Sequence, residues 1–141
     1  MAIVQTATTT FKNSLLSGTE DFAGASPYTY KIALYNANAD LSSTTATYTT
    51  VNEITGTGYT AGGKVLSPSV AYDNATNTAY VTFDNVTWNP ASFTCRGALV
   101  YNSTTNAACF VLNFGSDKTA NTIFTITFPT ASSTSAILRI S

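Results

Sequence analysis

The acidic side chains are the residues of this 141-residue chain best suited to chemistry, because the sequence holds seven acids and no histidine. Histidine is the commonest general base and transition-metal ligand, so its absence excludes a Ser–His–Asp triad. Hydrolysis by paired carboxylates needs two acids that converge on one cleft. Only Glu20 and Asp21 are adjacent, and we interpret them as solvated loop residues. We therefore expect no catalytic residue and a protein that is not an enzyme.

Two loops could offer a ligand oxygen atoms or backbone amides, but turn geometry explains both of them. Residues 73–77 (DNATN) supply several oxygens, yet they lack the acidic spacing of an EF-hand calcium loop. Residues 56–63 are rich in glycine, yet they lack the Lys-Ser/Thr pair of a P-loop. We expect turns at both places, and neither a metal site nor a cofactor site in the chain.

The charge balance argues against nucleic acid and membranes as partners. Six basic and seven acidic residues leave a formal net charge of −1, and 9% of the residues are charged. This fraction is far below the roughly 25% of an average soluble domain, and it supplies no basic patch for phosphates or anionic lipids. Threonine, serine and asparagine keep the surface polar instead. Because these side chains are easier to desolvate than lysine, the composition favours a packed assembly.

The two cysteines lie in two apolar runs that are typical of a β-hairpin. A turn between the runs would place Leu99 opposite Cys109 and Cys95 opposite Asn113. The cysteines would then lie roughly 13 Å apart along the strand, beyond the limit of about 7 Å for a disulfide. We expect two buried free thiols, as in a reducing compartment. The N-terminus shows no secretory signal, and no apolar run reaches the length of a membrane span, which favours synthesis in a cytoplasm.

A polar arm and one short helix are expected to precede the strands. Residues 1–10 show no periodicity and form the arm, and residues 11–141 form one domain, long enough for one hydrophobic core. Thr9 or Thr10 is the expected N-cap of a helix over residues 11–16, because glycine follows its end. The apolar stripe of this helix would dock on the domain; it consists of Phe11, Leu15 and Leu16.

After Pro27 the pattern changes to short strands with turn residues between them. In the first strand, Tyr30, Ile32 and Leu34 share one face. About eight such strands at close spacing predict an antiparallel β-sandwich, with Ig-like or jelly-roll-like connectivity left open. The expected strands are residues 28–35, 70–72, 78–83, 86–88, 93–101, 107–114, 123–128 and 136–140, with further short segments at 47–51 and 64–66.

The central hairpin bears on assembly, because both of its faces are apolar. An antiparallel sheet with one wet face should alternate apolar and polar residues instead. Either the arm or the helix covers the outer face, or another subunit buries it. For contacts with other chains we therefore expect residues of the arm, the helix and the hairpin: Ile3, Val4, Phe11, Leu15, Val100 and Phe110.

Three large side chains in the strands need a partner or a core. Arg96 and Arg139 stand in apolar strands, where a charge requires a counter-charge, and we expect Asp84 or Asp117 beside them. Trp88 could stack on a sugar or a base. The sandwich core or a subunit contact is the place that we favour for it.

Eight stretches, spread in order over almost the whole of residues 11–140, resemble a family of small virion structural proteins of tailed bacteriophages. None of them is a catalytic signature. The arm is the poorest match, and the two cysteines are peculiar to this chain. The stretches are FKNSLL, KIALYNANADL, YTTVNEITGTGYTAGGKVL, VTFDNVTW, RGALVYN, VLNFGSDK, and FTITFPT with AILRI at the end.

This resemblance implies a particle component without a reaction. The family resembles capsid decoration, or cement, proteins, which clamp neighbouring capsomers on the outer surface of the head. The expected partners are the major capsid protein or other virion proteins, together with further copies of the chain, in a homo-oligomer that we expect to be a trimer. The alternative is a neck, tail or head-fibre component, including a host-receptor or glycan-binding module in which Tyr59 or Trp88 stacks on sugar.

Overall fold

The computed structural model describes residues 2–24 and 26–141. In this part of the chain the architecture is all-β with one helix, which confirms the predicted fold class. The elements in chain order are β1 (Thr6–Ala7), α1 (Thr9–Leu16), β2 (Tyr30–Tyr35), β3 (Lys64–Val65), β4 (Pro68–Asp73), β5 (Thr78–Phe83), β6 (Val86–Trp88), β7 (Phe93–Asn102), β8 (Ala107–Ala120), β9 (Phe124–Ile126) and β10 (Leu138–Ile140).

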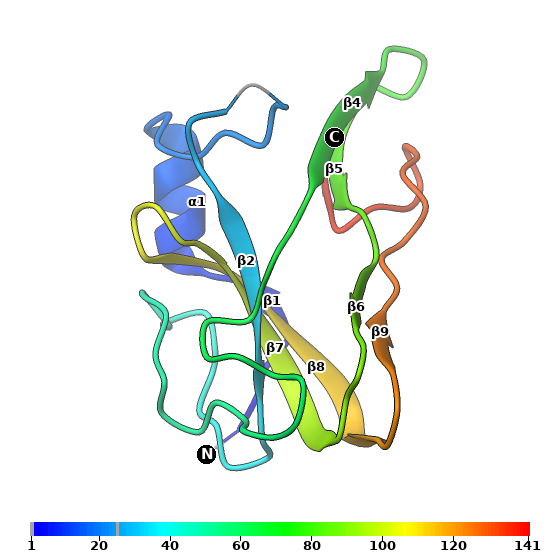
Figure 1. Ribbon diagram of the computed structural model, residues 1–141. Helices are drawn as coiled ribbons and strands as arrows, with labels where there is room; N and C mark the ends of the chain where they lie inside the picture. The colour runs from blue at the N-terminus through cyan, green and yellow to red at the C-terminus, as the bar shows by residue number, and fades with distance from the viewer. Residues whose placement is uncertain (1, 25) are drawn as a thin grey trace.

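Antiparallel sheets form two layers that face each other (Figure 1). One layer is a five-stranded sheet in the order β1-β8-β7-β2-β3. The other combines a three-stranded sheet, β10-β5-β4, with a two-stranded sheet, β6-β9. The layers diverge toward the end of the molecule where α1 and the β4–β5 hairpin lie. This strand order is the connectivity that the sequence pattern left open.

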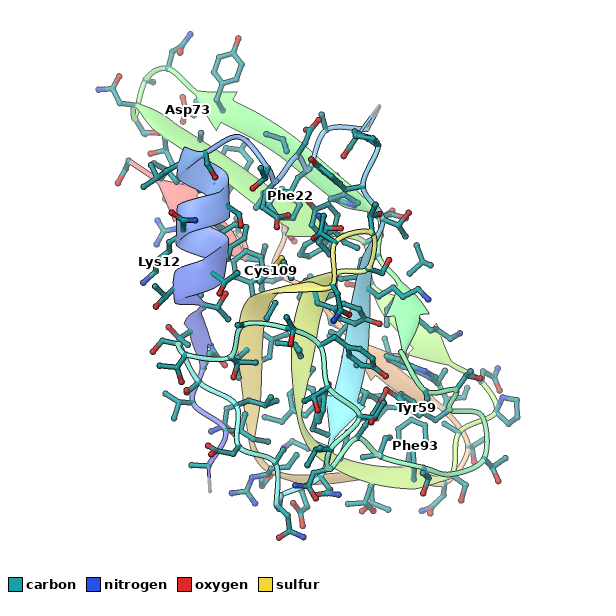
Figure 2. All side chains as sticks on the ribbon, turned by 90° about the vertical axis from the view of Figure 1, so that its left-hand side faces the viewer. Lys12, Phe22, Tyr59, Asp73, Phe93 and Cys109 are labelled. Carbon is teal, nitrogen blue, oxygen red and sulfur yellow. The ribbon has the colours of Figure 1, made fainter. Side chains whose placement is uncertain are left out.

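The main core fills the space between the layers, and aromatic rings make up much of it. Phe22 and Cys109 mark its end beside α1, and Tyr59 and Phe93 mark the opposite end (Figure 2). Phe22 stacks on Tyr30 with 4.5 Å between ring centroids, and Trp88 is only 1% exposed. The core position that we favoured for Trp88 is therefore confirmed.

A second, smaller core covers the outer face of the five-stranded sheet. Leu99 and Val111, on β7 and β8, are both fully buried there. Their cover is Ile3 from the N-terminal segment and Leu41 from the loop after β2. The sequence left two alternatives for the outer apolar face of the β7–β8 hairpin: burial by the chain's own arm or helix, or burial by another subunit. The structure shows that the arm covers this face.

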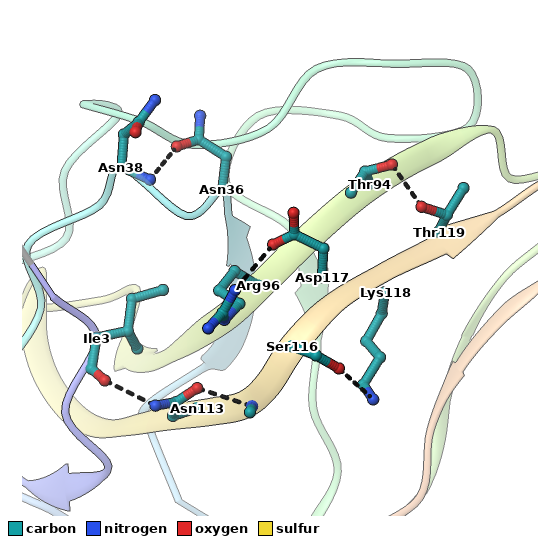
Figure 3. A network of polar contacts seen from close by, with 11 residues as sticks. Ile3, Asn36, Asn38, Thr94, Arg96, Asn113, Ser116, Asp117, Lys118 and Thr119 are labelled. Carbon is teal, nitrogen blue, oxygen red and sulfur yellow. Dashed lines mark hydrogen bonds and ion pairs between the residues drawn. The ribbon is translucent and has the colours of Figure 1, made fainter.

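The described part of the expected N-terminal arm is attached to the domain, because its residues join the sheet or begin α1. Strand β1 pairs with β8, and the Val4 amide donates to the Leu41 carbonyl at 2.8 Å. Asn113 Nδ2 donates to the Ile3 carbonyl at 2.9 Å (Figure 3). Gly97 makes room for the Ile3 side chain, because a Cβ on residue 97 would lie 2.9 Å from that side chain.

Helix α1 begins at Thr9, two residues earlier than predicted, and its N-cap bonds it to the sheet. Thr8, not Thr9 or Thr10, is the N-cap: its Oγ1 accepts from the Phe11 amide at 3.0 Å and donates to the Ala108 carbonyl at 2.8 Å. Phe11 is buried against the ring of Phe110. Leu16 is 90% exposed, so the predicted apolar stripe does not extend to it.

Four of the six residues expected to contact other chains lie in the chain's own core, which corrects that prediction. Each of the four is less than 8% exposed and packs against other strands or the helix: Ile3, Phe11, Val100 and Phe110. Only Val4, which is 51% exposed, and the half-buried Leu15 keep an accessible surface.

The register of the β7–β8 hairpin differs from the expected one. Leu99 pairs with Val111 rather than with Cys109, and Cys95 pairs with Lys118 rather than with Asn113. The shift begins at the turn, where Asn102 pairs with Ala107, and two irregularities enlarge it, one after Val100 and one between Cys95 and Gly97. The second contains Gly115 at a φ of +81°, which favours glycine. The cysteines therefore lie further apart along β8 than expected, and both are free and buried.

Replacing Val100 with aspartate should unfold the domain. Val100 is 0% exposed, so the new aspartate carboxylate would lie in the core without a counter-charge. We expect a loss of more than about 4 kcal/mol in the free energy of unfolding, measured by urea titration followed by circular dichroism. The matched control is Val51→Asp, because Val51 is 68% exposed; its loss should stay within about 0.5 kcal/mol. Equal losses in the two variants would contradict the assignment of Val100 to the core.

Candidate functional site

Glu53 is the centre of a polar cluster that holds the glycine-rich loop against the sheet. Its Oε2 accepts from the Tyr48 hydroxyl at 2.6 Å, and its Oε1 accepts from the Tyr59 hydroxyl at 2.6 Å and the Gly62 amide at 2.8 Å. The Tyr59 hydroxyl in turn accepts from the Leu34 amide at 2.9 Å. Burial, and then the hydrogen bond to Glu53, raise the pKa of Tyr59 above its ordinary value. The cluster ties the loop to β2.

The glycines of this loop are required by close approach of the backbone, as the turn interpretation predicted. A Cβ on Gly63 would lie 1.7 Å from the Ile32 carbonyl oxygen, and one on Gly58 would lie 1.8 Å from the Pro90 carbonyl oxygen. Both residues also have positive φ angles. The loop therefore packs directly on neighbouring backbone.

Glu20 is buried, which corrects its interpretation as a solvated loop residue. It is 8% exposed, and its Oε2 accepts from the Tyr30 hydroxyl at 2.7 Å and from Asn102 Nδ2 at 3.2 Å. Its Oε1 has no hydrogen-bond partner among residues 2–24 and 26–141. Asn102 Oδ1 also accepts from the Thr104 amide at 3.0 Å, in the β7–β8 turn. Glu20 thus joins the segment after α1 to β2 and to this turn.

The two thiols are protected from chemistry by burial. Desolvation, and next the charge of Asp117, raise the pKa of Cys95 to about 12. Desolvation also raises the pKa of Cys109 above its ordinary value, followed by the charge of Glu20. The thiolate is the reactive form of cysteine, so both side chains act as apolar core residues.

The loop at residues 73–77 is the predicted turn. Asp73 Oδ1 accepts from the Ala75 amide at 2.9 Å, and Asn77 has a φ of +53°. The Ala75 amide, and then Thr76, lower the pKa of Asp73. Among residues 2–24 and 26–141, no three His, Cys, Asp or Glu side chains converge so as to hold a metal ion.

One of the two expected arginine pairs is present. Arg96 lies 3.4 Å from Asp117 at an exposed bulge (Figure 3). Arg139 instead donates to the Ser133 carbonyl at 3.2 Å, and neither Asp84 nor Asp117 forms an ion pair with it. An exposed pair of this kind contributes at most about 1 kcal/mol.

An open apolar cleft lies between α1 and the three-stranded sheet, where the layers diverge. It has a volume of about 110 Å³. Val70 and Ile140, at its sheet side, are 56% and 53% exposed, and the neighbouring Tyr72 is 72% exposed. Leu16, the residue that follows Leu15 on α1, is 90% exposed. The lining residues are Leu15, Phe22, Val70, Ala79, Tyr80, Val81, Leu138 and Ile140.

This cleft is the candidate functional site, because its lining is suited to binding an apolar surface. Exposed apolar patches of this kind mark interaction sites. Of the six residues expected to contact other chains, only Leu15 lines it. The sequence pattern predicted the β4–β5 hairpin. It did not predict that the hairpin would be exposed to solvent, because the alternation of residues along β4 is the same whichever face of the hairpin is covered.

Comparisons of this chain with protein-family models, with curated proteins and with solved structures found no significant match. Within the described residues, no helix has the length and hydropathy needed to cross a bilayer.

Replacing Glu53 with alanine should destabilise the domain by about 2–4 kcal/mol, because two tyrosine hydroxyls and one amide lose a charged acceptor together. Asp40 is exposed and is the matched control: Asp40→Ala should change the free energy of unfolding by less than about 0.5 kcal/mol. Urea titration at pH 7 measures both values. A loss in Glu53→Ala no larger than the control would show that the cluster does not hold the loop.

Stability should fall as the pH rises above about 9. The unfolded thiols ionise near pH 8.5, whereas Cys95, with a pKa of about 12, keeps its proton in the fold. Between these values the folded chain binds more protons than the unfolded chain, so the free energy of unfolding decreases with pH, by about 1.4 kcal/mol per unit for each thiol. Urea titrations from pH 7 to 11 measure the slope, and a Cys95→Ala/Cys109→Ala variant should show a shallower one. An identical slope in that variant would contradict the assignment to the thiols.

Proposed function

We propose that this chain is a structural protein of a tailed-bacteriophage virion, and that it decorates the outer surface of the head without catalysing a reaction. Its partners in this role are the major capsid protein and further copies of itself. The contacts are non-covalent and are repeated over the symmetric shell. Many weak contacts, each contributing a few kcal/mol, then add up to a large stabilisation of the particle.

The observation that carries this proposal is the apolar cleft beside α1 together with the weakly charged surface around it. A monomeric protein gains nothing from leaving Val70, Tyr72 and Ile140 more than half exposed. Burying such a surface against a capsid or another copy removes apolar area from water without desolvating many charges. The resemblance over residues 11–140 supplies the virion context.

The buried acids and thiols have structural tasks, which supports a role without catalysis. Glu53 and Glu20 hold loops through tyrosine hydroxyls, and both cysteines are buried in the main core. The glycan-binding alternative needs accessible aromatic rings that can stack on a sugar. Trp88 is buried, and Tyr59 packs between Trp88 and Phe93, so the two residues named for this role lie in or against the core instead.

Copy number in purified particles tests the role. Quantitative mass spectrometry of the chain against the major capsid protein should give hundreds of copies per particle, in a simple ratio to the capsid subunits. A few copies to a few dozen would overturn decoration and place the chain in the neck, tail or a head fibre. Absence from the particles would overturn the virion role itself.

A further inference from the structure

We infer that a second copy of this chain covers the apolar cleft, with α1 of one copy against the β4–β5 hairpin of the other. This contact is a property of the chain by itself and does not require the virion role.

The two parts of such a contact lie side by side on each copy. Leu16 projects from α1 with 90% of its surface exposed, one residue after Leu15 in the cleft wall. The cleft itself is open and lined almost entirely by apolar side chains. A surface that carries a projecting apolar residue beside an apolar cleft is complementary to a copy of itself. In the contact, Leu16 of each copy enters the cleft of another.

The charges beside the cleft are also complementary between copies. Lys12 lies on the outer side of α1, one turn before Leu16, and Asp73 lies at the tip of the β4–β5 hairpin (Figure 2). Among the described residues, Arg96–Asp117 is the one ion pair between side chains, so within that part of the chain neither Lys12 nor Asp73 forms an ion pair. When α1 of one copy meets β4 of the next, Lys12 approaches Asp73 of that copy.

Strand β4 leaves room for a neighbour along its free edge. Among the strands that the structure describes it pairs with β5 alone, and all its residues are exposed or half-exposed. Apart from Pro68 at its start, it has none of the lysines or prolines that commonly protect an edge strand. The same copy that fills the cleft therefore also shields this edge.

The mass of the purified chain in solution tests the contact. Multi-angle light scattering at increasing concentration should give two or three times the mass of one chain. The measured mass shows whether the copies form a dimer or a ring of three. Leu16→Asp and Val70→Asp should each raise the dissociation constant at least tenfold. Val51→Asp, which alters an exposed residue outside the lining of the cleft, should assemble as the unchanged chain does. Circular dichroism checks that every variant is folded.

A mixing experiment tests the charge pairing independently of folding. Lys12→Asp alone places two acids in each contact, and Asp73→Lys alone places two lysines there, so both variants should be weakened. Mixed in equal amounts they should assemble more tightly than either variant does alone, because every contact between unlike variants joins opposite charges. Asp73→Asn retains an acceptor for the Ala75 amide and controls for loss of the turn.

Three outcomes would overturn the inference. The first is a chain that is monomeric at all concentrations, since the cleft would then await a different protein, such as a capsid subunit. The second is assembly that Leu16→Asp and Val70→Asp leave unchanged. The third is the absence of recovery when the two charge variants are mixed.

Discussion

Strands β2, β7 and β8 carry apolar side chains on both faces, and a sheet of this kind is stable in water only when both faces are covered. The second sheet layer and α1 cover one face. The other face is covered by Ile3 from the N-terminal segment and by Leu41 and Tyr48 from the long loop after β2. The position of the arm, the close approach at Gly97 and the folding of the long loop all follow from this second cover.

Two buried or half-buried carboxylates hold the covering segments in place. Glu53 fixes the glycine-rich loop, and Glu20 fixes the segment after α1. In each case tyrosine hydroxyls donate to the carboxylate, and no second charge is placed in the interior. In a chain with only 9% charged residues, the acids therefore contribute to architecture, while hydroxyl and amide groups keep the surface polar.

The remaining apolar surface is concentrated where the two layers diverge. The core between the layers is filled by aromatic rings, but beside α1 the inner face of the three-stranded sheet continues past the core into solvent at Val70 and Ile140. In the proposed contact, a second copy removes this area from water. The proposed assembly thus continues the main core across a molecular boundary.

The sequence by itself determined most of the strands, the helix and the turns, because alternation, capping residues and glycine act over a few neighbouring positions. Only the tertiary structure decided what covers the sheet, the burial of Glu20 beside Asn102, and the exposure of the cleft. These features join residues that are distant in sequence, so no local pattern reports them. The register of β7 and β8 belongs with them, since a bulge at Gly115 shifts every later pair. For the same reason a two-sided apolar hairpin could be recognised from the sequence, whereas the identity of its cover could not.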